Sequence, residues 1–352
     1  MANDFDGTCA GDAGVDDTGA PCFGSDSNVY RQVCPGTSFV STTVSGVTID
    51  TATDCDFIVA PRVTELGELE LCGVAFDTVN ITQLAAIGPR PLLIFARTLL
   101  SVEGEVDVAS HVTSPTVDPA GVALACEEGF GVKATGGAGG SAGGSFGTQG
   151  GKGGAGNGAQ GGLQTTPLIP TFTRGGCAGT QGGDSAAKGG IGGRPGGAIY
   201  FMSPTAIHIA SNGRVNASGA GALSADLAAG GGGGGSGGMI VLDAPSILID
   251  GVMFALGGGG SSGGSTGLGG RGNDPTGPGL PGAGGLDPVG AGGGMGGTGA
   301  PLSPVSDQAG PGTASGGAAG GGGGGGGIGI IRMSSGATLP PPTTKVQPTP
   351  LP

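Results

Sequence analysis

The carboxylates Glu103, Glu105 and Asp107 come closest, among the residues of this sequence, to a catalytic pattern. Their spacing of two places all three on one face of a strand. Asp243 and Asp250 occupy near-equivalent places in a later segment, and a pair of carboxylates can hydrolyse a glycosidic bond, as in polysaccharide-cutting enzymes built on β-helices. Sugar-active sites usually add an aromatic platform, whereas this chain has no Trp and only 2 Tyr. We therefore expect a solvated acidic face and no catalytic residue.

Gly-x-Ser-x-Gly sequences, the pattern of a serine nucleophile elbow, occur at residues 139–143, 143–147, 234–238 and 263–267. A nucleophile elbow needs its serine on the turn between a strand and a helix. Ser236 instead lies inside a glycine run, just before an apolar segment. Such matches are expected by chance in a chain with 88 Gly, so they predict no catalytic serine.

The two histidines of the chain are expected to be structural. His208 stands between Ile207 and Ile209, so strand alternation turns it to the face opposite these apolar neighbours. This placement predicts a solvated or hydrogen-bonded strand histidine. His111 follows directly on an alternating segment that ends at Ser110, and we expect it to support that end.

Seven cysteines are spread widely along the chain, and none forms a C-x-x-C pair, which argues against zinc or redox chemistry. Widely spaced cysteines in an acidic, lysine-poor chain are typical of structural disulfides formed in an oxidising compartment. We predict a local disulfide between Cys9 and Cys22 and a second one, Cys126–Cys177, at the base of the first glycine tract. The odd number leaves one thiol free or paired outside the chain. The candidates for disulfides are Cys9, Cys22, Cys34, Cys55, Cys72, Cys126 and Cys177.

A polar leader is predicted over residues 1–35, with several aspartates and three of the cysteines. Aspartates near glycine suit a calcium loop, but the D-x-D-x-D-G spacing of an EF-hand is not met. We therefore expect a disulfide-clipped leader and no cofactor, with calcium as the only metal to consider. The aspartates concerned are Asp4, Asp6, Asp12, Asp16 and Asp17.

The charge balance argues against several classes of partner. The 13 Lys and Arg are scattered against 26 Asp and Glu, giving a formal net charge of −13. Without a basic stripe, neither nucleic acid nor an anionic membrane is an expected partner. No apolar run is long enough for a transmembrane helix, and no signal peptide is visible at the start. We interpret the chain as a mature exported protein or a fragment of one, located outside the cell or at its surface.

Repeated apolar units specify the architecture. The clearest are Ala198–Ser218 and Met239–Leu256; Pro91–Ser110 is a looser copy and Ile328–Met333 a truncated one. Each divides into strand, turn, strand, glycine and a third short strand, which resembles one coil of a parallel β-helix. The expected turns are residues 96–98, 203–205 and 243–246, and the internal glycines are Gly104, Gly213 and Gly251. One such unit cannot bury its own apolar face and needs stacked neighbours.

Residues 36–90 are predicted to form an N-terminal β region. Ser38–Thr51 is rich in Val, Thr and Ile, and Cys55–Val63, Leu69–Phe76 and Val79–Leu84 follow at short spacing. We expect solenoid units with inserted glycine tracts over residues 91–335 and an extended, proline-rich tail over 336–352. The predicted fold is thus all-β, with a parallel β-solenoid core.

Long glycine tracts separate the apolar units at about 135–163, 175–197, 219–238 and 257–327. Their period is not strictly three, which excludes collagen. They could be flexible loops, as Gly/Ser linkers usually are. Alternatively, they could be extended three-fold helices packed side by side, because the lack of a Cβ lets backbones approach closely enough to hydrogen-bond. Their low content of charged residues suits packing, and the sequence leaves both readings open.

Several segments resemble the uncharacterised glycine-rich exported proteins of myxobacteria and related bacteria. The resemblance rests on GPRPLLIFARTLLSVEGEVDVASH (88–111), RGGCAGTQGG (174–183), GGAIYF…RVNASGAG (196–221), GGGGGGSGGMIVLDAP (230–245) and GGGGGGGGIGIIR (320–332). It implies a surface location and assigns no activity to any residue; a lipobox cysteine is missing here. In composition, the tracts are also similar to polyglycine-II bundles of phage tail-fibre tips and of a glycine-rich antifreeze protein.

Three functions follow as expectations. The first is a non-catalytic structural protein of the cell surface, either a self-associating filament subunit or an adhesin that contacts other surface components. The second is a receptor- or ice-binding module built on packed glycine helices. The third is a polysaccharide-active β-helix enzyme that would use the acids around Glu105.

Overall fold

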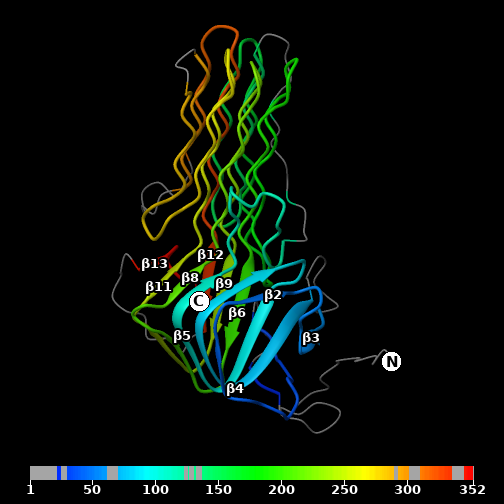
Figure 1. The fold of residues 1–352 in the computed structure, drawn as a ribbon, viewed down its shortest axis with the longest axis vertical. Coiled ribbons are helices and arrows are strands. Elements are labelled where there is room, and N and C mark those ends of the chain that lie inside the picture. Colours follow the sequence, from blue (N-terminus) through cyan, green and yellow to red (C-terminus); the bar gives the residue numbers. More distant parts are fainter. Residues whose placement is uncertain are drawn as a thin grey trace.

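The computed structural model contains strands and no helix among the residues it describes, so the described chain is all-β. Figure 1 shows a base that contains the strands and, above it, a long projection made of extended chain segments. The described residues are 22–24, 30–61, 70–122, 126, 131, 137–288, 292–300, 310–334 and 345–351.

The strands form one strongly curled sheet in which almost all neighbours run parallel. The N-terminal strands are β1 (Thr42–Val44), β2 (Val47–Asp50), β3 (Phe57–Val59), β4 (Leu71–Ile87) and β5 (Leu92–Asp107). The later ones are β6 (Ala198–Met202), β7 (Ala206–Ile209), β8 (Arg214–Asn216), β9 (Met239–Asp243), β10 (Ser246–Ile249), β11 (Val252–Phe254), β12 (Ile330–Met333) and β13 (Val346–Gln347). Among the strands of the described residues, β3 alone forms an antiparallel ladder, against the start of β4.

Successive apolar units stack in register, as a solenoid requires. The long strand β5 pairs with β4 on one side and, on the other, with β6, β7 and β8 in turn along its length. The next unit continues each row, because β9 pairs with β6, β10 with β7 and β11 with β8. Parallel stacking of three-strand units is therefore confirmed. In β4 and β5 the three strands are joined into one, with register shifts at the two corners.

The predicted turns at 203–205 and 243–246 fall at corners between strands, whereas the predicted turn at 96–98 lies within β5, where the register against β4 shifts. Residues 203–205 separate β6 from β7, and Pro245 lies in the turn between β9 and β10, where a missing N–H costs no ladder bond. Gly213 and Gly251 lie in the gaps before β8 and β11. Gly104 occupies the same corner within β5, where a Cβ would overlap the carbonyl oxygen of Thr82. Glycine is needed at this corner because stacked backbones approach too closely for a side chain.

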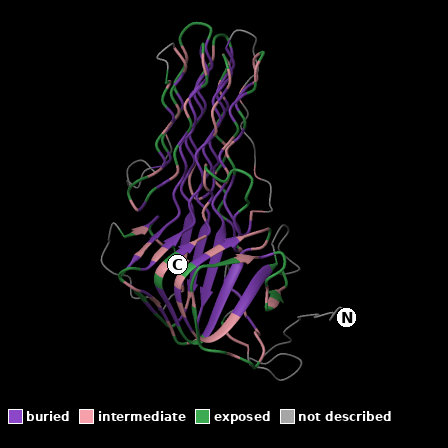
Figure 2. Cartoon of the chain, in the orientation of Figure 1, coloured by how far each residue is buried: buried purple, intermediate pink, exposed green. Residues whose placement is uncertain are grey.

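The hollow of the curled sheet is filled by apolar side chains. One row runs through Ile94, Phe201 and Leu242, all at most 1% exposed, and a second through Leu100 and Ile207. Figure 2 shows the strands of the base as mostly buried chain. The outer face of the β5–β6–β9 row is covered as well, by Phe23, Tyr30 and Val33 of the N-terminal segment and by Phe146.

The units do not close into coils of their own. After β8 and again after β11 the chain leaves the base along a glycine tract and returns along another one to begin the next unit. The glycine bundle, as we call the described residues 137–163, 174–197, 217–238, 255–288, 292–300 and 310–329, contains no regular helix or strand. Its segments run alternately away from the base and back toward it (Figure 1).

Backbone hydrogen bonds join neighbouring segments of the glycine bundle with a period of three residues. In the hairpin of residues 174–197, the N–H groups of Gly176, Gly179 and Gly182 donate to the carbonyls of Gly196, Gly193 and Gly190 at 2.9 Å. The tract 229–238 bonds to several neighbours in rotation. Its residues 230, 233 and 236 donate to tract 174–184, residues 231, 234 and 237 to tract 319–329, and residues 235 and 238 to tract 217–226, at 2.7–3.0 Å.

Uninterrupted glycine runs lie inside the bundle, and G-G-x sequences lie outside. Gly230–Gly235 and Gly320–Gly327 are buried throughout. In the outer segments every third residue is exposed, as in Lys152 and Ala155, Leu268 and Arg271, and Met295 and Thr298. Figure 2 shows this division between a buried interior and exposed outer edges and far loops. A segment with neighbours all round has no room for a Cβ, whereas an outer segment can turn one residue in three to solvent.

Three disulfides join described residues: Cys22–Cys34, Cys55–Cys72 and Cys126–Cys177. The predicted pairing of Cys126 with Cys177 is confirmed. The predicted Cys9–Cys22 pairing is wrong, because Cys22 bonds Cys34 across a short antiparallel bridge between Phe23 and Val33. Cys9 lies outside the described residues, as do the aspartates of the leader.

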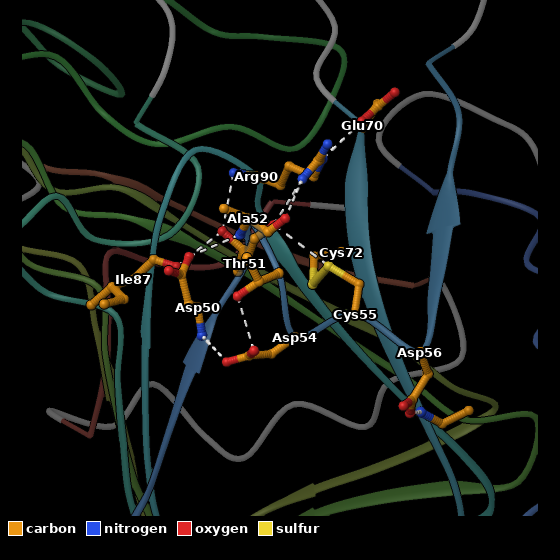
Figure 3. The surroundings of a disulfide bond; sticks show 12 residues. Asp50, Thr51, Ala52, Asp54, Cys55, Asp56, Glu70, Cys72, Ile87 and Arg90 are labelled. Carbon is orange, nitrogen blue, oxygen red and sulfur yellow. Dashed lines mark hydrogen bonds and ion pairs between the residues drawn. A yellow bond between two sulfur atoms is a disulfide. The ribbon is translucent and has the colours of Figure 1, made fainter. Parts of the chain in front are cut away.

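The Cys55–Cys72 disulfide fastens the loop after β2 to the start of β4 (Figure 3). Arg90 reinforces the same junction, with its Nε 2.7 Å from Glu70 and its Nη1 donating to the Thr51 carbonyl at 3.1 Å.

The described C-terminal segment, residues 345–351, is also fixed to the base. Val346–Gln347 pairs with β11 and Leu351 bridges to Arg332 in β12, so this part of the predicted tail is not a free spacer.

Candidate functional site

The acids on β5 share one outward face, as their alternation predicts. Glu103 and Glu105 are exposed and Asp107 is half-buried, whereas Val102 and Val106 are fully buried in the core. Two of these three acids are already paired and are not free to converge on a substrate. Glu105 lies 3.2 Å from Arg214, and Asp107 lies 2.9 Å from His111.

Asp250 occupies the position equivalent to Glu103 two units along the stack, whereas Asp243 is not aligned with the acids of β5. Asp250 follows Ile249 as Glu103 follows Val102, and it lies 3.1 Å from His208. This contact makes His208 the hydrogen-bonded strand histidine that the sequence predicts. The register places Asp243 beside Met202, in the row of β6, so grouping it with the acids of β5 is wrong.

Asp243 belongs to a polar cluster on the outer face of the β6–β9 row, beneath the N-terminal segment. It accepts a hydrogen bond of 3.0 Å from the Tyr200 hydroxyl, which in turn accepts one from the Arg31 backbone N–H. Burial raises the pKa of the Asp243 carboxyl, and it raises that of the fully buried Tyr200 hydroxyl well above its usual value. These bonds fix the N-terminal segment over β6 and β9.

The serines of the Gly-x-Ser-x-Gly sequences point into the glycine bundle. Ser141, Ser145, Ser236 and Ser265 are all buried, with at most 7% exposed. The Ser236 hydroxyl accepts a hydrogen bond of 2.8 Å from the Cys177 N–H, and that of Ser141 accepts one from Gly233. A serine here supplies an acceptor for a neighbouring N–H, which is a structural role.

His111 joins the base to the glycine bundle. Its Nε2 lies 2.9 Å from Asp107 at the end of β5, and its Nδ1 lies 3.7 Å from Asp274 of the bundle. Asp274 also accepts hydrogen bonds from the N–H groups of Val112 and Gly221. The hydrogen bonds with Asp107 and then Asp274 raise the pKa of His111 to about 10, so the imidazolium is charged at neutral pH.

Stability is expected to fall with rising pH because of this histidine. Its folded-state pKa lies above the value of about 6.5 for an unfolded chain, so its contribution is complete below pH 6.5 and is lost as the pH rises toward 10. Since 42% of the side chain is exposed, we expect only about 1 kcal/mol. Denaturant unfolding of the wild type and of His111→Gln should differ at pH 6.5 and converge by pH 10. A difference that stays constant with pH would contradict this role.

A pocket of about 300 Å³ lies beside His111, where the base meets the bundle. We call it the junction pocket. The loop after β5 contributes Val112, Pro115, Asp118 and Val122, and three adjacent bundle segments contribute the other walls. Arg194 ties the loop to the bundle through an ion pair with Asp118 and a hydrogen bond to the Pro115 carbonyl.

Comparison with models of protein families, with curated proteins and with solved structures gives no match.

Sequence reasoning did not find the junction pocket or the Arg194–Asp118 pair. The pocket is built from segments far apart in sequence, around residues 112–122, 178, 191–195 and 220–223. One signal of the site was present in the sequence, because Asp107 and His111 are close in sequence and opposite in charge.

Within the described chain, no group of His, Cys, Asp and Glu is placed to hold a metal ion. The same residues contain no helix of the length and apolarity that crossing a membrane requires.

Proposed function

We propose that this chain is a non-catalytic protein of the cell exterior, an adhesin whose glycine tracts form a rigid bundle of the polyglycine-II type. The observation that carries the proposal is the rotation of backbone hydrogen bonds around tract 229–238, which joins neighbouring segments through successive residues. A three-residue period of this kind is what a three-fold extended helix produces. The bundle holds its outer side chains and far loops away from the base.

Rigidity is the physical advantage of this arrangement. An isolated glycine chain is the most flexible polypeptide and has the most entropy to lose on ordering. Buried N–H and C=O groups must find partners, and here the neighbouring segments supply them along Gly230–Gly235 and Gly320–Gly327. Because each segment depends on its neighbours for hydrogen-bond partners, we expect the segments of the bundle to lose their order cooperatively.

Three features support an exported location. Disulfides at Cys22–Cys34, Cys55–Cys72 and Cys126–Cys177 persist in oxidising surroundings. Charged residues are sparse, at 11% of the chain, and the net charge is −13. A closely packed, hydrogen-bonded backbone also gives a protease little extended chain to bind.

Covered sheet edges favour an adhesin over a filament subunit. The short strands β1, β2 and β3, of three, four and three residues, form the edge beyond β4, and short edge strands offer little ladder to a strand from another copy. At the other end of the stack, β13 covers β11 and Leu351 bridges to β12. Between them, β10 pairs only with β7 among the described strands, but it is four residues long. Short or covered edges work against end-to-end addition of solenoids.

The alternative functions have less support. An ice-binding face needs a regular array of small residues, whereas the third positions of the outer segments hold residues as different as Lys152, Arg271 and Leu286. A polysaccharide-active site needs converging free carboxylates, whereas Glu105 and Asp107 are paired with Arg214 and His111.

Binding to intact cells tests the proposal. Fluorescently labelled protein should bind saturably to at least one member of a panel of bacterial and eukaryotic cells, and unlabelled protein should compete. Protein that has been reduced and unfolded serves as the control for nonspecific adhesion. Absence of saturable binding across the panel would contradict the adhesin role, as would filaments in electron micrographs of concentrated protein.

A further inference from the structure

The junction pocket is a preformed hollow with both apolar and hydrogen-bonding walls. Ile191 and Leu223, on adjacent bundle segments, form one apolar side, and Val122 and Pro115 of the loop form another. The Leu223 N–H donates to the Ile191 carbonyl at 2.9 Å, so backbone bonding fixes the first side in place. Ile191 stands at the pocket with 59% of its surface exposed.

The polar atoms of the pocket are held in place by their own partners. Arg194 uses Nη1 for Asp118 and Nε for the Pro115 carbonyl. Nη2 of Arg194 and Oδ2 of Asp118 have no partner among the described residues, so one donor and one acceptor group remain side by side. The Arg194 and Asp118 side chains are 32% and 55% exposed, so both are reachable from solvent.

The charged residues that line the pocket are already paired. Arg194 is paired with Asp118, and the charged His111 lies between Asp107 and Asp274, which do not line the pocket and leave that cluster with one net negative charge. A cationic ligand would meet the positive charges of Arg194 and His111, and an anionic ligand would meet Asp118 and the excess carboxylate beside His111, unless it broke one of these pairs. The wall therefore favours a neutral ligand that can both donate and accept hydrogen bonds.

The volume of the junction pocket narrows the class of ligand further. Ligand pockets usually measure about 300–1,000 Å³, and this one lies at the lower limit with about 300 Å³. It has room for a single ring and not for an oligosaccharide. A hexose combines the required features, because one face presents C–H groups and its adjacent hydroxyls both donate and accept.

We propose that the junction pocket binds one neutral hexose unit, with its C–H face on Ile191 and Leu223 and two adjacent hydroxyls on Asp118 and Arg194. This inference rests on the proposed adhesin function and names a ligand class for it, a neutral sugar at the end of a surface glycan. Without an aromatic platform, the affinity for a single sugar is expected to be weak, with a Kd of about 1 mM or above. An adhesin gains strength from many copies on one surface.

Saturation-transfer NMR on the whole protein tests the proposal with methyl glucoside, methyl galactoside and methyl mannoside as neutral probes. Glucuronic acid and glucosamine are charged counterparts, and cyclohexylmethanol has the apolar ring without adjacent hydroxyls. At least one neutral hexoside should give a saturable signal with a Kd of about 1–20 mM, and the charged and apolar probes should bind at least about tenfold more weakly. Equal or better binding of cyclohexylmethanol, or of either charged sugar, would overturn the assignment.

Matched variants locate the binding. Ile191→Asp adds a charge to the pocket, and Leu268→Asp makes the same change at a bundle position that is 60% exposed and does not line it. Hexoside binding should weaken about tenfold or more in Ile191→Asp and remain within about twofold in Leu268→Asp. Thermal unfolding of both variants verifies folding. Should Ile191→Asp prove unfolded, Asp118→Asn, which preserves shape, should weaken binding similarly.

The sugar assay tests the junction pocket and the cell assay tests the adhesin role, so the failure of one proposal can be distinguished from the failure of the other. Saturable cell binding without hexoside binding, or hexoside binding that Ile191→Asp leaves unchanged, overturns the pocket proposal and leaves the adhesin role intact. Hexoside binding lost in Ile191→Asp supports the pocket even if none of the cells chosen for the panel binds the protein.

Discussion

Gly323→Ala is expected to destabilise the glycine bundle strongly, lowering the free energy of unfolding by about 3 kcal/mol or more. A Cβ on Gly323 would overlap the carbonyl oxygen of Gly232 in the neighbouring tract. The backbones would have to separate, and the hydrogen bonds from Gly323 to Ser261 and from Gly297 to Gly323 would lengthen together. Denaturant unfolding, followed by circular dichroism and by intrinsic tyrosine fluorescence, measures the loss.

Gly316→Ala is the matched control. Gly316 lies in a far loop of the same bundle, is exposed, and has no heavy atom closer than 4.0 Å to the position of an added Cβ. Its backbone conformation is not left-handed, so alanine fits, and removing a glycine stiffens the unfolded chain. The control should change stability by no more than about 1 kcal/mol, in the stabilising direction. Equal stability of the two variants would contradict a packed interior at Gly323.

Removal of the Cys126–Cys177 disulfide is expected to cost about 4 kcal/mol. This bond spans 51 residues of sequence, which include the first glycine segments of the bundle. A cross-link stabilises mainly by restricting the unfolded chain, and the restriction grows with the length of the closed loop. The Cys126→Ser/Cys177→Ser double variant should therefore unfold at markedly lower denaturant concentration than the wild type.

The Cys22–Cys34 pair supplies the comparison, because it spans only 12 residues. The same loop-length argument gives about 3 kcal/mol for the corresponding double-serine variant, so the two variants should rank in that order. A larger loss for the short loop, or no loss for the long one, would contradict the view that the first glycine segments are ordered parts of the fold. Adding a reductant to the wild type should reproduce both losses together.

The base could be predicted from the sequence to a large extent. Apolar alternation and the glycines at 104, 213 and 251 were sufficient to place the corners and strands of each unit, because side-chain burial in a stacked sheet is a local pattern. The same reasoning did not anticipate that β4 and β5 would each run through two corners as one strand. It also chose the wrong partner for Cys22, since spacing alone does not decide between Cys9 and Cys34.

The glycine segments were harder to predict, because glycine has no side chain whose polarity could indicate a neighbour. Gly231 and Gly321 are hydrogen-bonded to each other although about ninety residues separate them, and no sequence pattern indicates this pairing. A usable signal was nevertheless present. Uninterrupted runs such as Gly230–Gly235 lie inside the bundle, whereas G-G-x sequences lie outside, because only an outer segment has room for a side chain.

The candidate site depends on contacts that only the fold creates. His111 was expected to be structural, and the fold gives it two acidic partners, Asp107 and Asp274, of which the second is distant in sequence. Arg194 and Asp118 likewise meet only because a bundle segment passes the loop after β5. Long-range pairs of this kind are outside the reach of local patterns.

Amide hydrogen exchange of the glycine segments tests the central claim most directly. If the bundle is packed and hydrogen-bonded, the amides of Gly230–Gly235 and Gly320–Gly327 should exchange as slowly as those of the core strands β6 and β9, at rates set by cooperative opening. Exposed far-loop amides, such as those of Gly158 and Gly317, should exchange quickly and serve as the internal reference. Exchange of the interior glycines at random-coil rates would contradict the packed bundle and the rigid projection proposed from it.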